Sequence, residues 1–227
     1  MNFGEVFFDS LSYPFKDLKK FLILFVLFLG SFLLIPLIVG YGYLLRIIEH
    51  SLKGEKGLPD FNNWGELFTK GIDYLVVNAV YGIPSLLVTF LLFKKLDFNS
   101  ISNGLIFSSP VNMLILVLVG FIAGIVFIMA LANLVYENRF FAAFDFKRIF
   151  HLIGMVGWKK YLFYVAVYTL ILNLISLPLL IFLSPHILTF GALYIIFTLI
   201  NSILSVYKGI FGSRFKGLIY PLKINKN

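Results

Sequence analysis

The chain has 227 residues, of which 60% are hydrophobic and 13% charged, and it carries a formal net charge of +8. This composition is too apolar for a water-soluble domain of this size, and a sequence without cysteine excludes disulfides, thiolate metal ligands and cysteine nucleophiles. The positive residues flank apolar runs and form no basic tract, which favours anionic lipid headgroups as partners and argues against nucleic acid.

Five apolar runs are long enough to cross a lipid bilayer as helices. They cover residues 21–45, 72–93, 111–136, 161–184 and 187–207. The runs are apolar on every face, whereas a strand of a membrane β-barrel alternates apolar and polar residues. We therefore expect one all-α, multi-pass integral domain over residues 1–227 of a cell-membrane protein, with about five transmembrane helices.

The first run, residues 21–45, leaves two arrangements open. Residues 1–20 lack the basic start and small-residue cleavage site of a signal peptide, so we expect the run to remain in the protein. It crosses the bilayer completely, or it breaks near Gly30 or Pro36 and returns to the same side. We prefer the complete crossing, because 25 residues are barely enough to enter and leave a core about 30 Å thick.

The distribution of lysine and arginine predicts the orientation. Five complete crossings place 14 of these residues on one side and 5 on the other, whereas a re-entrant first segment gives 17 and 2. In both arrangements the positive-inside rule puts the C-terminus in the cytoplasm. The N-terminus lies outside in the first arrangement and inside in the second.

The polar connections are predicted to carry amphipathic helices that lie along the membrane interface. Residues 144–160 show this pattern most clearly, with an ordinary solvated connector helix as the alternative. The stretches 60–81 and 145–168 resemble each other after a two-residue insertion, which predicts a parallel repeat with both copies on one side. Chance similarity between apolar helices is the alternative to a repeat.

Catalytic, metal-binding and cofactor-binding motifs are missing from the sequence. His50, His151 and His186 stand alone, without the spacing of metal ligands. The sequence contains neither a phosphate-binding glycine loop nor a nucleophile elbow. We therefore expect a protein that is not an enzyme and that holds no cofactor.

The charged residues avoid the centres of the apolar runs. Arg46, Asp73, Glu137 and Lys208 fall at the ends of runs, where we expect their side chains to reach headgroups. Ion-coupled transport normally requires charged groups at membrane depth, so this distribution does not favour it.

Uncharged polar and small residues do enter the runs. Asn78, Asn173 and Asn201 are most simply explained by hydrogen bonds between helices, whereas three asparagines facing one cavity would suggest a pathway for a neutral solute. Gly120 and Gly124 form a Gly-x-x-x-Gly motif, which predicts close helix packing within the chain or in a homo-oligomer.

Aromatic and basic residues mark the expected interface. Trp64 and Trp158 lie near the ends of apolar runs, where amphipathic rings sit at headgroup level. Arg148 lies in the amphipathic stretch and is predicted to be interfacial as well.

Several short motifs resemble a known family. They are Tyr13-Pro14-Phe15-Lys16-Asp17, Gly40-Tyr41, Leu45-Arg46-Ile47-Ile48 and Leu58-Pro59-Asp60-Phe61, the last followed by Trp64. Over essentially the whole chain, the sequence resembles the archaeal and bacterial membrane proteins known as domain of unknown function 4013. The resemblance implies a small multi-pass membrane protein and assigns no functional residue. Asn62-Asn63 stands where the family favours acidic residues, which argues against a cation site in this loop.

These features favour a membrane module that organises lipids or protein partners. The alternative is a channel or facilitator for a neutral or small polar solute, suggested by the asparagines within the runs.

Overall fold

The computed structural model describes residues 3–93, 110–181 and 191–221, and in these residues it contains helices and no strands. This confirms the all-α prediction. The elements are α1 (Phe3–Ser12), η1 (Tyr13–Phe15), α2 (Leu18–Leu29), α3 (Leu34–Leu52), α4 (Trp64–Phe93), α7 (Pro110–Glu137), η2 (Phe140–Phe144), α8 (Phe146–Val156), α9 (Trp158–Ile181) and α10 (Gly191–Ile219).

Four helices of the described chain are long and apolar enough to cross a membrane. The candidate spans are Trp64–Leu92 in α4, Pro110–Glu137 in α7, Trp158–Leu177 in α9 and Ile195–Ile219 in α10. They correspond to the last four of the five predicted runs, so the polytopic helical architecture is confirmed with one span fewer.

The first predicted run is divided into two helices. α2 has 12 residues, and a helix of this length is about 18 Å long, too short for a hydrocarbon core of about 30 Å. It ends at Gly30, and α3 packs back against it, because a Cβ added at Gly40 would lie 3.1 Å from the Phe28 ring. Neither α2 nor α3 is among the candidate spans. The break between them favours the re-entrant alternative over one complete crossing, and the choice between the two stays a prediction.

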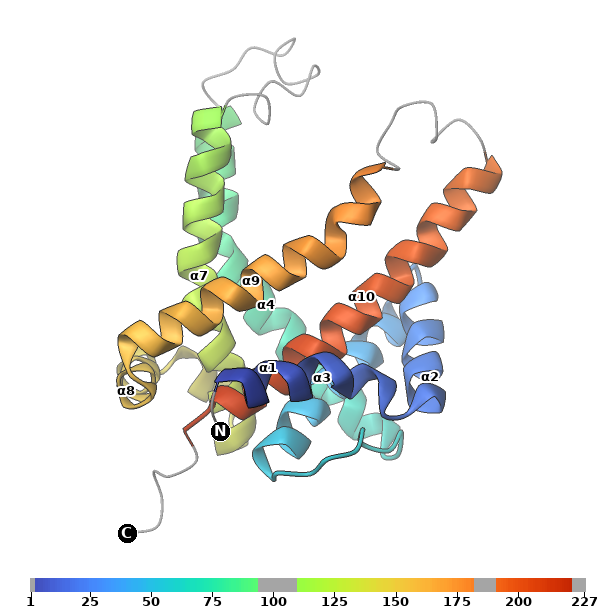
Figure 1. Cartoon of the computed structure of the whole chain (residues 1–227), viewed down its shortest axis with the longest axis horizontal. Coiled ribbons are helices and arrows are strands. Elements are labelled where there is room, and N and C mark those ends of the chain that lie inside the picture. Colours follow the sequence, from blue (N-terminus) through green and yellow to red (C-terminus); the bar gives the residue numbers. More distant parts are fainter. Residues whose placement is uncertain (1–2, 94–109, 182–190, 222–227) are drawn as a thin grey trace.

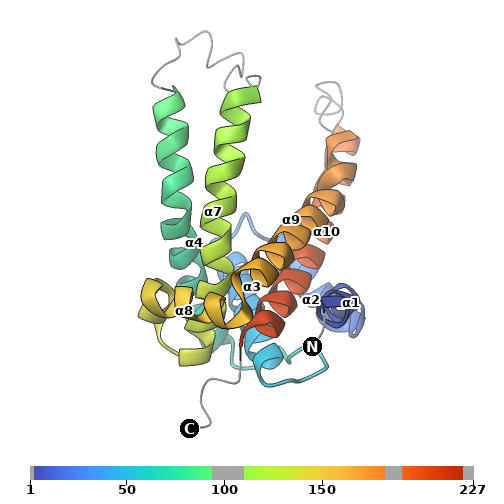
Figure 2. The same ribbon diagram turned by 60° about the vertical axis from the view of Figure 1, so that its left-hand side comes forward.

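The helices form a broad base from which two helix pairs rise and diverge (Figure 2). One pair is α4 with α7 and the other is α9 with α10, while α1, α3 and α8 lie in the base (Figure 1). Both α1 and the end of α10 lie in this base. The first and last described helices therefore meet at the same end of the molecule.

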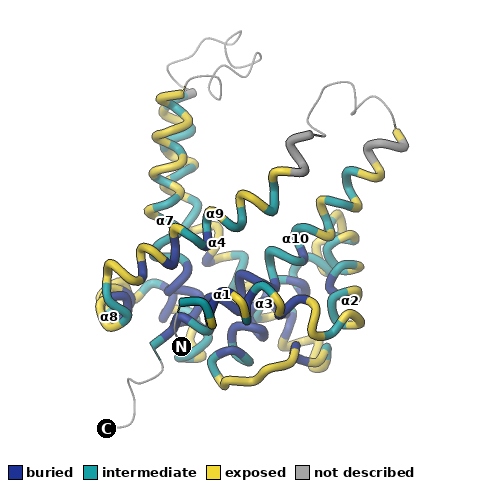
Figure 3. The backbone as a smooth tube through the Cα atoms, viewed as in Figure 1, coloured by how far each residue is buried: buried dark blue, intermediate teal, exposed yellow. Residues whose placement is uncertain are grey.

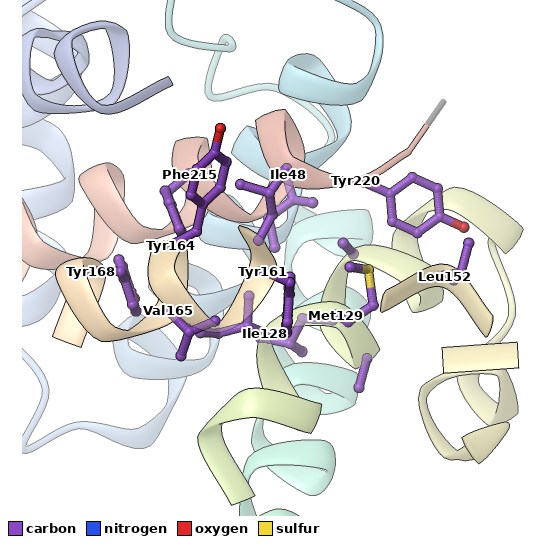
Figure 4. Close-up of a cluster of buried hydrophobic side chains, with 14 of the residues drawn as sticks. Ile48, Ile128, Met129, Leu152, Tyr161, Tyr164, Val165, Tyr168, Phe215 and Tyr220 are labelled. Atoms are coloured by element: carbon purple, nitrogen blue, oxygen red, sulfur yellow. The ribbon is translucent and has the colours of Figure 1, made fainter. Parts of the chain in front are cut away.

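Buried residues concentrate in the base, and the upper parts of the long helices are largely exposed (Figure 3). Met129, Tyr161 and Phe215, from three different long helices, are fully buried together there (Figure 4). By contrast, Leu86 and Phe90 of α4 are 67% and 65% exposed. A membrane protein buries its polar backbone within helices and turns such apolar side chains to lipid.

The predicted amphipathic helix is present as α8. Its N-cap residue is Asp145, whose side chain accepts a hydrogen bond of 3.0 Å from the Arg148 backbone N–H. One face, including Ile149 and Leu152, is buried, while Phe150 on the other face is exposed. α8 ends at Gly157, whose positive φ of 92° favours glycine and separates α8 from α9.

The proposed repeat stays a prediction. Its two stretches lie at the same end of the molecule, at the start of α4 and in α8 (Figure 2). The first stretch continues directly into α4, whereas Gly157 interrupts the second before α9.

Two glycines let the backbones of α3 and α4 touch. A Cβ added at Gly42 would lie 1.7 Å from the carbonyl oxygen of Leu67, and one at Gly71 would lie 1.9 Å from that of Ile38. Among the described atoms, a Cβ at Gly120 or Gly124 would meet nothing within 4 Å. The close helix contact within this chain thus uses Gly42 and Gly71, and the Gly-x-x-x-Gly motif of α7 has no such contact there.

We expect Gly42→Ala to lower the free energy of unfolding by at least about 1–3 kcal/mol, because the added methyl group overlaps a backbone oxygen that has no room to move. Gly120→Ala is the matched control and should leave stability unchanged or slightly higher, since alanine favours the helix. Thermal unfolding followed by circular dichroism in detergent compares the two variants. Equal stability of both would contradict the close α3–α4 contact.

Candidate functional site

A cavity of about 470 Å³ lies where α9 and α10 meet the first helices of the chain. Its walls come from α2, α3, α4, α9 and α10. The lining residues are Phe28, Tyr41, Leu44, Tyr74, Tyr168, Thr169, Leu172, Asn173, Ser176, Ser205, Lys208, Gly209, Ser213 and Lys216.

A polar stripe on α10 forms one wall of the cavity. Ser205, Lys208 and Lys216 lie within an arc of about 80° around the helix axis, so they are on the same side of α10. Thr169, Asn173 and Ser176 form the corresponding stripe on α9. The two helices therefore present polar groups to a space whose surroundings are otherwise apolar.

Two lysine ammonium groups reach this cavity, and no carboxylate is among the described residues that line it. Lys216 is only 7% exposed, and its Nζ donates a long hydrogen bond of 3.4 Å to the Tyr168 hydroxyl. Lys208 is half-buried and donates to Ser176 Oγ at 3.1 Å. Hydroxyl groups solvate these cations but leave their charge uncompensated, which is costly in an apolar surrounding.

Aromatic rings also line the cavity. The Tyr41 and Tyr74 rings are stacked with centroids 4.6 Å apart. The Tyr168 ring, which lies beside Lys216, is stacked on Phe215 at 4.6 Å. Ammonium groups next to flat aromatic rings are suited to an amphiphilic anion.

The Ser176 hydroxyl is not arranged as a nucleophile. Its Oγ donates a hydrogen bond of 2.9 Å to the Leu172 carbonyl and accepts one from Lys208. An activated serine needs a base that accepts its proton, whereas here the proton points to the backbone. The Ser176 hydroxyl is therefore oriented by the Leu172 carbonyl and by Lys208.

The three predicted asparagines do not converge on one cavity. Asn173 lines it, and its amide nitrogen donates to the Thr169 carbonyl on the same helix at 2.8 Å. Asn78 and Asn201 are exposed and are not among its lining residues.

The predicted interfacial residues divide into two groups. Trp64 and Trp158, at the starts of α4 and α9, are 51% and 45% exposed in the base. Arg148 instead turns inward, because its Nε donates to Asn133 Oδ1 at 3.1 Å and its guanidinium pairs with Glu137.

Arg46 belongs to a buried polar cluster that sequence reasoning missed. It is 6% exposed, and its Nη1 donates to the carbonyl oxygens of Asp60 and Asn62 at 2.9 and 2.7 Å. Its Nη2 pairs with Glu66 at 3.1 Å. The expectation that Arg46 reaches headgroups is therefore wrong. The sequence did contain an indication that Arg46 is buried, because the apolar pattern continues beyond it with Ile47 and Ile48.

Arg214 of α10 completes this cluster from the other end of the chain. Its Nε pairs with Asp9 at 2.6 Å and its Nη1 donates to the Glu55 carbonyl at 2.7 Å. Burial raises the pKa of Asp9, but hydrogen bonds from Lys16 and Arg214 outweigh it, so the pKa is lowered and the carboxylate stays charged. Two arginines from distant helices thus hold the loop over residues 53–63.

Comparison with known proteins identifies a family without an assigned activity. The model of the family described as "Protein of unknown function (DUF4013)" matches residues 29–206. Two similar proteins come from Methanocaldococcus jannaschii. Uncharacterized protein MJ1189 is 26% identical over 215 residues, covering 85% of this chain and 72% of its own length. Uncharacterized protein MJ0233 is 29% identical over 241 residues, covering 96% and 83%. No solved structure matches the chain.

We expect Arg46→Met to lower the free energy of unfolding by about 3 kcal/mol, because methionine removes the buried donor shared by the Asp60 and Asn62 carbonyls and the Glu66 carboxylate. Arg139→Met removes the same charge from a side chain that is 69% exposed, and it should change stability by less than about 0.5 kcal/mol. Chemical unfolding in detergent micelles measures both. Similar losses in the two variants would contradict the role of Arg46.

The stability of the base should depend on pH through Glu49. Burial raises the pKa of Glu49, but hydrogen bonds from Lys53 and Lys70 lower it from 4.5 to about 2. Because the folded value lies below the unfolded one, this contribution is complete above about pH 4.5 and is lost as the pH falls towards 2. The free energy of unfolding, measured between pH 6 and 2, should be higher for the wild type than for Glu49→Gln at pH 6, and this difference should shrink as the pH falls. A difference in free energy that stays constant over this range would refute the role of Glu49.

Proposed function

The chain belongs to the DUF4013 family of proteins of unknown function, and we propose that it is a non-enzymatic membrane protein that binds and organises anionic lipids. One observation carries the proposal. The cavity between α9, α10 and the first helices holds Lys208 and Lys216, and no carboxylate is found among its described lining residues.

The charge balance of the cavity favours an anionic ligand. A cation removed from water loses hydration worth several kcal/mol, and hydroxyl partners replace only part of it. A phosphate group placed against Lys216 would supply both a counter-charge and charge-assisted hydrogen bonds. Because Lys216 is held by the packed base, the site exists before the ligand arrives.

The surroundings of the cavity favour a ligand with hydrocarbon chains. The helices that rise from it expose large apolar side chains, among them Leu170 and Leu174 of α9, which are 58% and 52% exposed. Hydrocarbon chains of a lipid would continue the aromatic wall of Tyr41 and Tyr74 along these helices. A water-soluble anion would gain nothing from this apolar surface.

The outer surface of the base supports the same function. Lys147 and Lys159 are exposed there beside Trp158 and Phe150, a combination suited to the headgroup region of anionic lipid. By the positive-inside rule, we place this base and the C-terminus in the cytoplasm. A homo-oligomer through the open faces of Gly120 and Gly124 stays a prediction.

A facilitator for a neutral solute is less well supported. That alternative required several asparagines around one cavity, and Asn173 alone among the three lines it. The cations beside Asn173 favour an anion over a neutral solute.

We expect anionic lipid to stabilise the protein through the cavity. In nanodiscs, replacing part of the phosphatidylcholine by phosphatidylglycerol should raise Tm by several degrees, because a ligand at about 100 times its Kd adds about 2.7 kcal/mol. The double variant Lys208→Gln and Lys216→Gln should lose most of this increase.

The control is the double variant Lys147→Gln and Lys159→Gln, which removes the same charge from the exposed surface of the base. It should keep most of the increase in Tm. An increase that is the same in both double variants and the wild type would show that anionic lipid acts on the surface alone, and the proposed function would fail.

A further inference from the structure

We propose that the α2–α3 hairpin enters a single leaflet of the bilayer and ends inside it, with its outer face against the acyl chains of phospholipids. This surface is separate from the cavity of the proposed function, because Leu22, Val26 and Phe32, which belong to it, do not line that cavity. The proposal rests on the length of the two helices, on the hydrogen bonds of the turn between them and on the apolar surface that they expose.

Both arms of the hairpin are shorter than the hydrocarbon core. α2 has 12 residues and is about 18 Å long, against a core of about 30 Å. The apolar first part of α3, residues 34–45, is of similar length, and the buried Arg46 follows it. α2 ends well below the tops of the long helices (Figure 1). A hairpin of this length that starts at the headgroups ends near the middle of the bilayer.

Both arms of the hairpin are held on the same side by the loop over residues 53–63. At the start of α2, Lys20 Nζ donates to the Leu58 carbonyl at 2.7 Å and pairs with the Asp60 carboxylate at 2.8 Å. In α3, Arg46 donates to the Asp60 carbonyl at 2.9 Å. Since one loop binds both arms, the N-terminus lies on the same side of the membrane as the end of α3.

The turn between the arms supplies partners for its own backbone, which hydrocarbon requires of an irregular segment. The Gly30 N–H donates to the Val26 carbonyl at 2.9 Å, and the Ser31 N–H donates to the Phe28 carbonyl at 3.1 Å. The Leu33 N–H donates to the Gly30 carbonyl at 2.9 Å. With these donors paired, the turn leaves water without the penalty of three unsatisfied N–H groups.

The hairpin exposes apolar side chains at the turn and along one face of α2. Phe32 at the turn is 82% exposed. On α2, Leu18, Leu22 and Val26 are 65%, 50% and 63% exposed and recur every four residues, which places them on one face. The opposite face, with the fully buried Leu24, packs against α3 and α10. So many apolar side chains together mark a surface that a lipid or a protein covers.

The groove along this outer face favours a lipid. It has a volume of about 680 Å³, and Lys19 in the first turn of α2 and Trp64 at the start of α4 are exposed residues of its lining. Leu22, Val26 and Leu27 line it further along α2, towards the turn. A basic group and an indole at one end, followed by aliphatic side chains, match a phospholipid headgroup followed by its acyl chains.

Site-directed spin labelling of the full chain in phosphatidylcholine vesicles tests this assignment. The sequence contains no cysteine, so each single-cysteine variant carries one nitroxide. Phe32→Cys labels the turn, Val26→Cys labels the outer face of α2, and Lys56→Cys labels the exposed loop as a control. Collisions with oxygen, which concentrates in hydrocarbon, and with a water-soluble nickel chelate are measured for each label.

Oxygen should relax the labels at Val26 and Phe32 more strongly than nickel does, and the order should be reversed at Lys56. The ratio of oxygen to nickel relaxation should be higher at Phe32 than at Val26, because the turn lies near the bilayer centre, about 15 Å from the edge of the core. Leu34→Cys, at a side chain that is 72% exposed, repeats the measurement at the turn should Phe32→Cys misfold.

Any of three results would overturn the assignment. Strong nickel relaxation at Phe32 would place the turn in water, and its labelling by a membrane-impermeant maleimide from the side opposite to Lys56 would identify a complete crossing. An immobile nitroxide at Val26 that neither oxygen nor nickel reaches would identify a protein partner or a second copy on this face. None of these results bears on stabilisation by phosphatidylglycerol through Lys208 and Lys216, so the proposed function stands or falls separately.

Discussion

The loop over residues 53–63 imposes the constraint on which the base of this protein depends. Its irregular backbone leaves carbonyl groups that no helix pairs, and side chains of the neighbouring helices donate to them and fix the position of the loop. Arg46 from α3 and Arg214 from α10 donate to them at 2.7 to 2.9 Å, and Tyr43 donates to the Pro59 carbonyl at 2.8 Å. Arg214 also pairs with Asp9 of α1. One loop thereby joins the first, third and last helices of the described chain.

This constraint also determines where the cavity forms. The direct backbone contact at Gly42 and Gly71 holds α3 against α4, and Arg214 holds the end of α10 against the same base. α9 and α10 diverge from α4 and α7 above this point (Figure 2). The cavity lies between these helices, and α10 contributes Lys208 and Lys216 to its lining. The cavity that we propose as a lipid site is therefore a product of how the base positions these helices.

The sequence predicted the helices well and the sites poorly. The last four apolar runs became long helices, and residues 144–160 contain the amphipathic helix α8, because length and periodicity are local properties. The first run is divided into α2 and α3, which its apolar composition did not reveal, because the break depends on the packing of Phe28 against Gly40. Likewise, the sequence placed Lys208 at the end of the last predicted run. In the structure α10 continues to Ile219, and Lys208 lines the cavity.

The sequence alone determined the class of this protein, since runs of apolar residues longer than a bilayer core leave the helix as the way to satisfy their backbone. It also determined the absence of cysteine chemistry. Only the tertiary structure decided which polar residues work together. Arg46 and Arg214, or Tyr168 and Lys216, are far apart in the chain and meet because helices cross, and no local pattern encodes that distance. These contacts carry the site that we propose, so the sequence alone could not locate it.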